Sequence, residues 1–186
     1  MTASNLQNAL RDVVRRLRAA TVHVRDRRGS GSGIVWAEGL VISNAHVVRE
    51  VRPYVETARG YVRGRLLARD EGTDLAAIAV DLDGLGTERA RVRDAATLRC
   101  GELVLAVGNP LGLRGAVSGG MLQHADRRFA VSDVRLAPGN SGGPLADATG
   151  SVAGVNSMVA GARAFAVSSE TVRAFVMEEV ARRRAA

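Results

Sequence analysis

Residues 138–144 read Pro138-Gly139-Asn140-Ser141-Gly142-Gly143-Pro144, and the turn-forming residues in this segment surround a single hydroxyl that the rest of the chain is expected to position. Glycine adopts backbone angles and close approaches that a β-carbon forbids, so the Ser141 side chain is predicted to be exposed. In such a turn the N–H groups of Gly139 and Ser141, on either side of Asn140, can point into one small space. That space would stabilise the negative oxygen of a tetrahedral acyl intermediate. A Gly-rich hairpin with an incidental serine is the alternative interpretation.

A serine nucleophile needs a base to take its proton, and a carboxylate to orient that base. The chain has three histidines, which are His23, His46 and His124. His46 follows the apolar run 40–43, where small polar residues end a predicted strand. Asp74 stands just before the apolar run 75–80. The order His46, Asp74, Ser141 therefore predicts a catalytic triad, and we expect His23 and His124 to be structural or surface residues.

Two other orders of serine hydrolase residues fit the sequence less well. Ser141 also matches the G-x-S-x-G pattern of α/β-hydrolases, but that fold needs its histidine after the serine, and no histidine follows Ser141. A subtilisin-like order would place Asp26 before His46. The arginines that flank Asp26 instead make it part of a solvated charge cluster.

Taken together, the motifs resemble the protease domain of the HtrA (DegP-like) branch of the trypsin-like serine proteases, from about Thr21 to Ser169. The matching segments are residues 31–35 (GSGIV), 43–48 (SNAHVV), 73–76 (TDLA), 108–112 (GNPLG) and 139–145 (GNSGGPL). The resemblance implies an all-β fold of two packed six-stranded barrels, with the active site between them. It also implies a serine endopeptidase that acts on unfolded or damaged polypeptides without a metal or another cofactor.

The resemblance also implies which residues bind substrate. Leu136 is similar to a wall residue of the first specificity pocket, and Ser157 and Met158 are similar to the strand that receives the substrate backbone. These residues favour a medium apolar side chain at P1, such as Val, Leu or Ala. Counting as in digestive proteases instead puts Arg135 at the pocket floor, where it would select acidic side chains. Both alternatives remain open.

Activation is expected to differ from that of the trypsin-like zymogens. Those proteins carry Asp where this chain has Asn140, and an amide cannot form the ion pair with a freed N-terminus. We therefore expect control by ordering of the loops at 110–120 and 135–140. Glycines make the first loop pliable, so a resting form with an unformed oxyanion hole is an alternative.

The pattern of apolar residues divides the chain into parts that one domain of this size can pack together. The expected parts are an amphipathic helix within 1–20, a first barrel at 21–80, a connector at 81–99, a second barrel at 100–168 and a C-terminal helix at 169–184. Each barrel is expected to have about six short strands. One of these strands is expected over 61–68.

Composition limits the other functions that can be considered. A single cysteine, Cys100, excludes an intrachain disulfide, and we expect this residue to be buried or half-buried. The net charge is +7, and all 26 basic residues are arginine. These arginines are scattered among acidic residues, and aromatic residues make up only 3% of the chain, so nucleic-acid binding is the less favoured alternative. A non-catalytic chaperone or holdase on the same fold is the other alternative.

The N- and C-terminal segments of the printed sequence bear on where the protein is located and how it assembles. No run of about 18 apolar residues predicts a membrane span. The N-terminus lacks a hydrophobic signal core, so a cytoplasmic location is expected as the sequence is printed, and a periplasmic or secreted one if an export segment precedes it. HtrA relatives usually continue into a PDZ module, and none follows Ala186. They also trimerise through aromatic residues in the N-terminal region, and none precedes Trp36.

Overall fold

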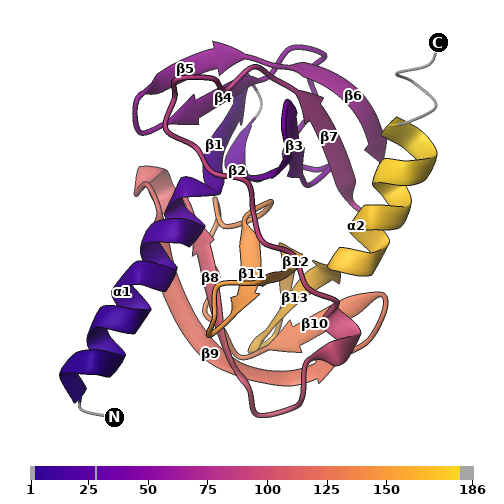
Figure 1. The fold of residues 1–186 in the computed structure, drawn as a ribbon. Helices are drawn as coiled ribbons and strands as arrows, with labels where there is room; N and C mark the ends of the chain where they lie inside the picture. The colour runs from indigo at the N-terminus through magenta and orange to yellow at the C-terminus, as the bar shows by residue number, and fades with distance from the viewer. Residues whose placement is uncertain (1–2, 28, 181–186) are drawn as a thin grey trace.

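The computed structural model describes residues 3–27 and 29–180. Its strands form two stacked β units, with β1 to β7 in one and β8 to β13 in the other (Figure 1). The first unit is an open seven-stranded sheet in the order β5-β4-β1-β2-β3-β7-β6. The second is a closed barrel in the order β10-β13-β12-β11-β8-β9. The predicted all-β class with two packed units is confirmed.

The first unit has seven strands where six were expected, because the run at 61–68 is broken at Gly64. A β-carbon on Gly64 would lie 2.4 Å from Cγ2 of Ile78, so only glycine lets the chain bend this close to the neighbouring strand. The strands are β1 (Thr21–Asp26), β2 (Gly29–Ala37), β3 (Leu40–Ser43), β4 (Tyr54–Thr57), β5 (Gly60–Arg63), β6 (Arg65–Asp70) and β7 (Leu75–Ala79). Because β5 pairs with β4 and β6 pairs with β7, the sheet stays open as a half-barrel.

The second unit has the predicted six strands and an interior of small apolar side chains. Its strands are β8 (Leu103–Gly108), β9 (Ala116–Ala125), β10 (Phe129–Ser132), β11 (Pro144–Asp147), β12 (Val152–Ala160) and β13 (Arg163–Ser168). Buried residues such as Ala106, Leu122 and Leu145 form one of its clusters. The turn at 138–143 lies between β10 and β11, on a frame that closes on itself.

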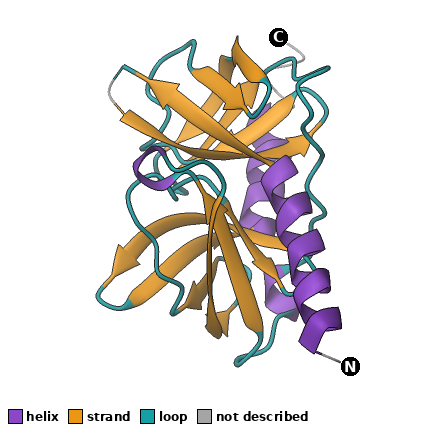
Figure 2. Cartoon of the chain, turned by 90° about the vertical axis from the view of Figure 1, so that its left-hand side faces the viewer, coloured by secondary structure: helices purple, strands orange, loops and turns teal. Residues whose placement is uncertain are grey.

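The two helices lie at opposite edges of the β units in Figure 1, and in the turned view of Figure 2 both lie toward the right. Helix α1 (Ala3–Ala19) buries Val13 and Leu17 in a core cluster that includes side chains from both units, while Leu6 near its start is 48% exposed. Helix α2 (Ser169–Phe175) begins after Ser168, whose hydroxyl accepts from the Thr171 N–H at 3.1 Å, and it continues as a π-helical turn at Val176–Val180. The last residues of the predicted 169–184 helix lie outside the described residues.

The segment between the two units is fastened to both of them. The N–H of Ala90 donates to the Val35 carbonyl of the first sheet, and the N–H of Arg93 donates to the Val152 carbonyl of the second barrel, each at 2.9 Å. The carboxylate of Glu170 accepts from the N–H groups of Ala95 and Ala96 at 2.9 and 3.1 Å. The connector is therefore hydrogen-bonded to the first sheet, to the second barrel and to α2.

Cys100 is exposed, so the prediction that it is buried is wrong. The residue lies in a turn before β8, and its thiol donates to the Gln123 carbonyl at 2.9 Å. No helix within 3–27 or 29–180 is long and apolar enough to cross a bilayer.

Candidate active site

His46 and Asp74 come together because the strands that precede and follow them are neighbours in the first sheet. β3 ends at Ser43 and β7 begins at Leu75, and Ser43 is paired with Ala76 across the two strands. The Asp74 carbonyl also accepts from the Ala45 N–H at 3.1 Å and from Asn44 Nδ2 at 2.9 Å. The two loops are therefore fastened to each other at one rim of the sheet.

The His46 ring and the Asp74 carboxylate are in direct contact. His46 Nδ1 lies 2.9 Å from both carboxylate oxygens, and the His46 backbone N–H donates to Oδ1 at 3.1 Å. Asp74 holds this position with φ of 56°, in the left-handed region that non-glycine residues rarely adopt. Strain of this kind costs on the order of 1–3 kcal/mol and is concentrated at functional sites.

The environment of Asp74 keeps its carboxyl group ionised. Burial alone would raise the pKa, but hydrogen bonds from His46 and Ser157 outweigh burial and hold the pKa of Asp74 below its ordinary value. An ionised carboxylate can only accept, so His46 Nδ1 carries the proton that faces it. The other ring nitrogen, Nε2, is then left with a free lone pair, which a general base requires.

Ser141 reaches this pair through Ser157. The Ser141 hydroxyl donates to the Ser157 carbonyl at 3.3 Å, and the Ser157 hydroxyl donates to Asp74 Oδ2 at 2.5 Å. Within the described residues, no hydrogen bond joins the His46 ring to the Ser141 hydroxyl. Two hydrogen bonds, from Ser141 to Ser157 and from Ser157 to Asp74, thus form a bridge from the second barrel to the first sheet, and the residues predicted from the sequence lie around it.

The contact between Ser157 and Asp74 was not foreseen from the sequence. The register between β12 and β13 shifts between Asn156 and Met158, so Ser157 lies at an irregularity in the strand. Such irregularities re-aim a side chain. In the sequence Ser157 is only one of two adjacent polar residues in β12, beside Asn156, and its partner belongs to the other β unit.

The turn that carries Ser141 fits tightly against the first sheet. A β-carbon on Gly142 would lie 2.0 Å from the Ser32 carbonyl oxygen, and Gly142 has a φ of 85°. The Ser32 N–H donates to the Ser141 carbonyl at 2.7 Å, and the Ser32 hydroxyl donates to the Gly139 carbonyl at 2.7 Å. Ser32 is fully buried and was not predicted as a functional residue, because its partners in this turn lie more than a hundred positions away.

The amide groups of the turn differ in whether they are engaged. The Asn140 N–H donates to the Ala137 carbonyl at 3.0 Å, so it is not free for a ligand. Within the described residues, the N–H groups of Gly139 and Ser141 have no hydrogen-bond partner. The Pro138 carbonyl accepts from the Leu111 N–H at 3.2 Å. Because a trans peptide is planar, the Gly139 N–H of that same peptide points away from Leu111.

The predicted substrate-binding residues differ in burial. Leu136 is half-buried and packs against the apolar cluster that contains Ala164 and Ala166, whereas Arg135 is exposed. Met158 is 57% exposed on β12. An apolar pocket wall at Leu136 is compatible with these positions.

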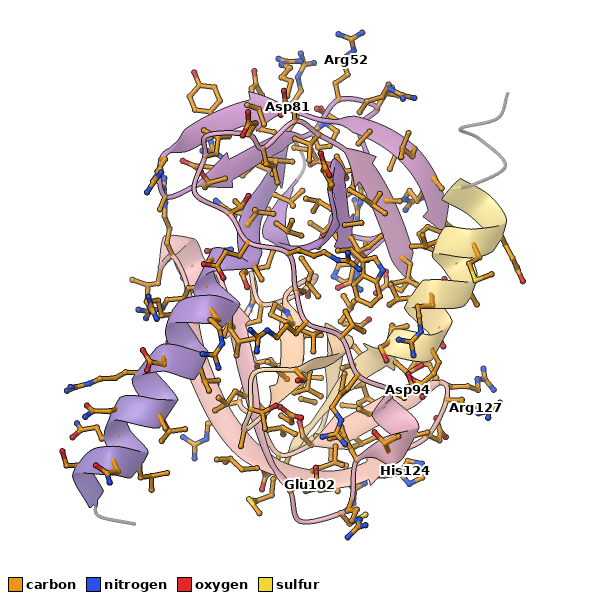
Figure 3. All side chains as sticks on the ribbon, in the orientation of Figure 1. Arg52, Asp81, Asp94, Glu102, His124 and Arg127 are labelled. Carbon is orange, nitrogen blue, oxygen red and sulfur yellow. The ribbon has the colours of Figure 1, made fainter. Side chains whose placement is uncertain are left out.

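The other two histidines lie apart from this arrangement. His23 is largely buried, its Nδ1 lies 3.2 Å from Glu56, and burial lowers the pKa of the ring. His124 is exposed beside Asp126 on the side of the barrel that faces away from the first sheet (Figure 3). Across residues 3–27 and 29–180, no group of three or more His, Cys, Asp or Glu side chains could hold a metal ion.

Comparison with known proteins gives a consistent set of matches. A family model described as "Trypsin-like peptidase domain" matches residues 31–155. The "Probable periplasmic serine endoprotease DegP-like" of Halomonas elongata is 36% identical over 149 residues, which cover 74% of this chain and 31% of that protein. "Serine protease HTRA1B" of Danio rerio is 32% identical over 198 residues, covering 92% of this chain and 41% of that protein.

A solved structure agrees with these sequence matches. The serine endoprotease from Yersinia pestis superposes with a TM-score of 0.82 at 29% identity, covering 98% of this chain and 68% of that one. The chain spans less than half the length of the curated relatives named above.

The role of Ser157 can be tested by replacing it with alanine. Ser157→Ala removes one hydrogen bond to the carboxylate, so the pKa of Asp74 should rise toward 3.8, as measured by carboxyl carbon NMR during a pH titration. Because the pKa is lowered in the folded state, ionised Asp74 stabilises the protein above pH 3.8 and the stabilisation is lost as the pH falls through the lowered pKa. This loss should occur at higher pH in the variant. Ser118→Ala serves as the control, and an unchanged Asp74 pKa in Ser157→Ala would refute the bridge.

Proposed function

The chain belongs to the trypsin-like serine peptidases, in the branch of the HtrA and DegP proteases, and on that premise we propose that it hydrolyses peptide bonds in unfolded polypeptides. The proposal assigns Ser141 as nucleophile, His46 as general base and Asp74 as the residue that orients the imidazole. The relatives are named serine proteases, and the chain covers only part of their length, so the activity and the substrates are proposed for this chain.

One observation carries the proposal: His46 Nδ1 lies 2.9 Å from both oxygens of an Asp74 carboxylate whose pKa is lowered. This pairing fixes the imidazole in the tautomer that can accept a proton at Nε2. A protein that only bound unfolded chains would have no use for a strained, ionised aspartate behind a histidine. The arrangement therefore favours the peptidase over the chaperone alternative.

The first chemical step is attack by the Ser141 oxygen on the peptide carbonyl. In the resting structure the hydroxyl donates to the Ser157 carbonyl at 3.3 Å, so this hydrogen bond must break before the hydroxyl donates to His46 Nε2. His46 takes the proton as the Oγ–C bond forms, and then gives it to the leaving amine as the peptide bond breaks. Water, deprotonated by the same ring, then attacks the acyl carbon, and the ring gives the proton to Ser141 Oγ as the ester bond breaks.

The negative oxygen of the intermediate is proposed to bind the N–H groups of Gly139 and Ser141, with Asn140 as the buried residue between them. Two observations support an oxyanion hole that is formed in the resting protein. The two N–H groups have no hydrogen-bond partner among the described residues, and the Leu111 N–H holds the Pro138 carbonyl. This favours the preformed hole over the unformed alternative.

Specificity for medium apolar P1 side chains is proposed on the packing of Leu136 against an apolar cluster. Ser157 and Met158 would lie beside the substrate backbone at the end of β12 nearest to Ser141. The exposure of Arg135 argues against a role at the floor of a closed pocket.

The compartment and the assembly stay predictions. The Halomonas elongata relative is named periplasmic, which favours the exported alternative over the cytoplasmic location expected from the printed sequence. Fractionation of cells that express the complete gene would measure the compartment, and sedimentation of the purified chain would measure its oligomeric state.

Replacement of the nucleophile tests the proposed reaction. Ser141→Ala should abolish hydrolysis of an unfolded protein such as β-casein, because removal of a serine nucleophile costs on the order of 10⁶-fold in turnover. It should also abolish covalent labelling by a fluorophosphonate, which the native protein should show and should lose on heating. The exposed Ser30→Ala is the matched control and should keep both properties. Labelling that persists in Ser141→Ala would contradict the assignment, and a native protein that binds unfolded chains without labelling would favour the chaperone.

The P1 preference can be read from the products of a peptide library. The native protein should cleave after Val, Leu or Ala, and Arg135→Ala should leave this preference unchanged because the arginine is exposed. Leu136→Asn should reduce cleavage after these residues. A native preference for Asp or Glu that disappears in Arg135→Ala would place the arginine in the pocket instead.

A further inference from the structure

The loop at 109–115, between β8 and β9, contacts the oxyanion turn at one of its ends. The Leu111 N–H donates to the Pro138 carbonyl at 3.2 Å, and the Asn109 N–H donates to the Gly139 carbonyl at 3.3 Å. A β-carbon on Gly139 would lie 2.5 Å from the Asn109 carbonyl oxygen, so the loop and the turn are packed backbone to backbone. A displacement of this loop must therefore displace the peptide that carries the Gly139 N–H.

The other end of the loop is fastened outside the second barrel. Arg114 forms an ion pair with Glu56 of β4, and its second guanidinium nitrogen donates to the Thr57 carbonyl at 3.1 Å. Arg18 of α1 donates to the Gly115 carbonyl at 2.7 Å. The Gly115 N–H in turn donates to the Asn109 side chain at 3.1 Å, which links the two ends of the loop.

Apolar burial does not hold the middle of the loop. Leu111 is 81% exposed and Leu113 is 66% exposed, so neither side chain anchors the loop in a core. Leu111 also has a φ of 51°, which is an uncommon conformation for a non-glycine residue and carries a conformational cost. The conformation of this segment therefore depends on the polar contacts at its ends.

Glu56 is suited to anchor a loop because its carboxylate is largely withdrawn from water. Its side chain is 16% exposed, whereas that of Arg114 is 55% exposed. His23 Nδ1 lies 3.2 Å from Glu56, and Arg25 lies 3.7 Å from it, so the carboxylate is held by neighbours on β1 as well. A partly buried acceptor that is fixed by its own sheet gives Arg114 a more rigid partner than an exposed surface pair would.

We propose that Glu56 and Arg114 are positioning residues for the oxyanion hole, acting from the first sheet through the loop at 109–115. The inference rests on the proposed peptidase function and adds to it a specific contact between the two β units. Neither residue touches the substrate. Their ion pair holds Leu111 against Pro138, and thereby keeps the Gly139 N–H aimed at the site of the developing oxyanion.

The kinetic test compares Glu56→Gln, Arg114→Gln and the double variant with the native protein. The loss of one oxyanion donor costs about 10² to 10³ in turnover, so displacement of a donor should lower kcat by about tenfold. KM should stay within about twofold, because the contacts of the ground state are retained. The kcat of the double variant should be no lower than that of the single variants, because each single substitution already breaks the same contact. Arg114→Lys should restore part of the loss.

The matched control is Glu50→Gln, which removes a carboxylate from the loop between β3 and β4, one that lies 3.7 Å from Arg27. It should keep the native kcat. An unchanged kcat in Arg114→Gln, or a rise in KM with kcat retained, would overturn the proposal. Fluorophosphonate titration of active sites corrects each kcat for misfolded protein, and the exposed position of Arg114 makes its variant the safer one for folding.

Amide hydrogen exchange supplies a second readout that does not need activity. Exchange at the Leu111 N–H group should be about tenfold faster in Glu56→Gln and Arg114→Gln, and should be unchanged at β12 and β13. Equal exchange at Leu111 in all variants would overturn the anchoring. If the native protein is inactive but the two variants still show faster exchange at Leu111, the proposed peptidase is refuted while the anchoring itself holds.

Discussion

A fully buried serine, Ser32, joins the first sheet to the turn on which the chemistry depends. Its backbone N–H holds the Ser141 carbonyl, its hydroxyl holds the Gly139 carbonyl, and the same hydroxyl accepts from the backbone and side-chain nitrogens of Asn109 at 2.9 and 3.0 Å. Ser32 and Asn109 are buried, and an unsatisfied polar group at either residue would cost about 1–3 kcal/mol. The turn at 138–143 is therefore fixed by hydrogen bonds from the opposite β unit as well as by its own barrel.

This cross-connection explains why two separate β units make one site. The first sheet supplies the His46–Asp74 pair at the rim formed by β3 and β7, and the second barrel supplies Ser141 and the two free amides. Ser157 closes the connection from the other side, because its hydroxyl bonds Asp74 while its carbonyl receives the Ser141 hydroxyl. A shift of one unit against the other would disturb the proposed base, nucleophile and oxyanion hole together. The core cluster beneath α1, which includes side chains of both units, opposes such a shift.

The sequence predicts those parts of the site that follow from local pattern. His46 and Asp74 lie at the ends of neighbouring apolar strands, and the glycines around Ser141 indicate a turn, so both placements follow from strand periodicity and turn chemistry. The roles of Ser32 and Ser157 could not be predicted, because a hydroxyl can donate in many directions and its partner is fixed only by tertiary packing. The seventh strand was missed because Gly64 lies in a run that alternates like a single strand, and its close contact with Ile78 is visible only when β5, β6 and β7 are assembled.

This packing should present Ser141 and the Gly139 N–H to one point in space. A crystal structure of the fluorophosphonate adduct tests that arrangement. The phosphorus should be bonded to Ser141 Oγ, with its phosphoryl oxygen about 2.7–3.1 Å from the nitrogens of Gly139 and Ser141 and with the Pro138 carbonyl still held by the Leu111 N–H. An adduct on another side chain, or a Gly139 N–H turned away from the phosphoryl oxygen, would contradict it.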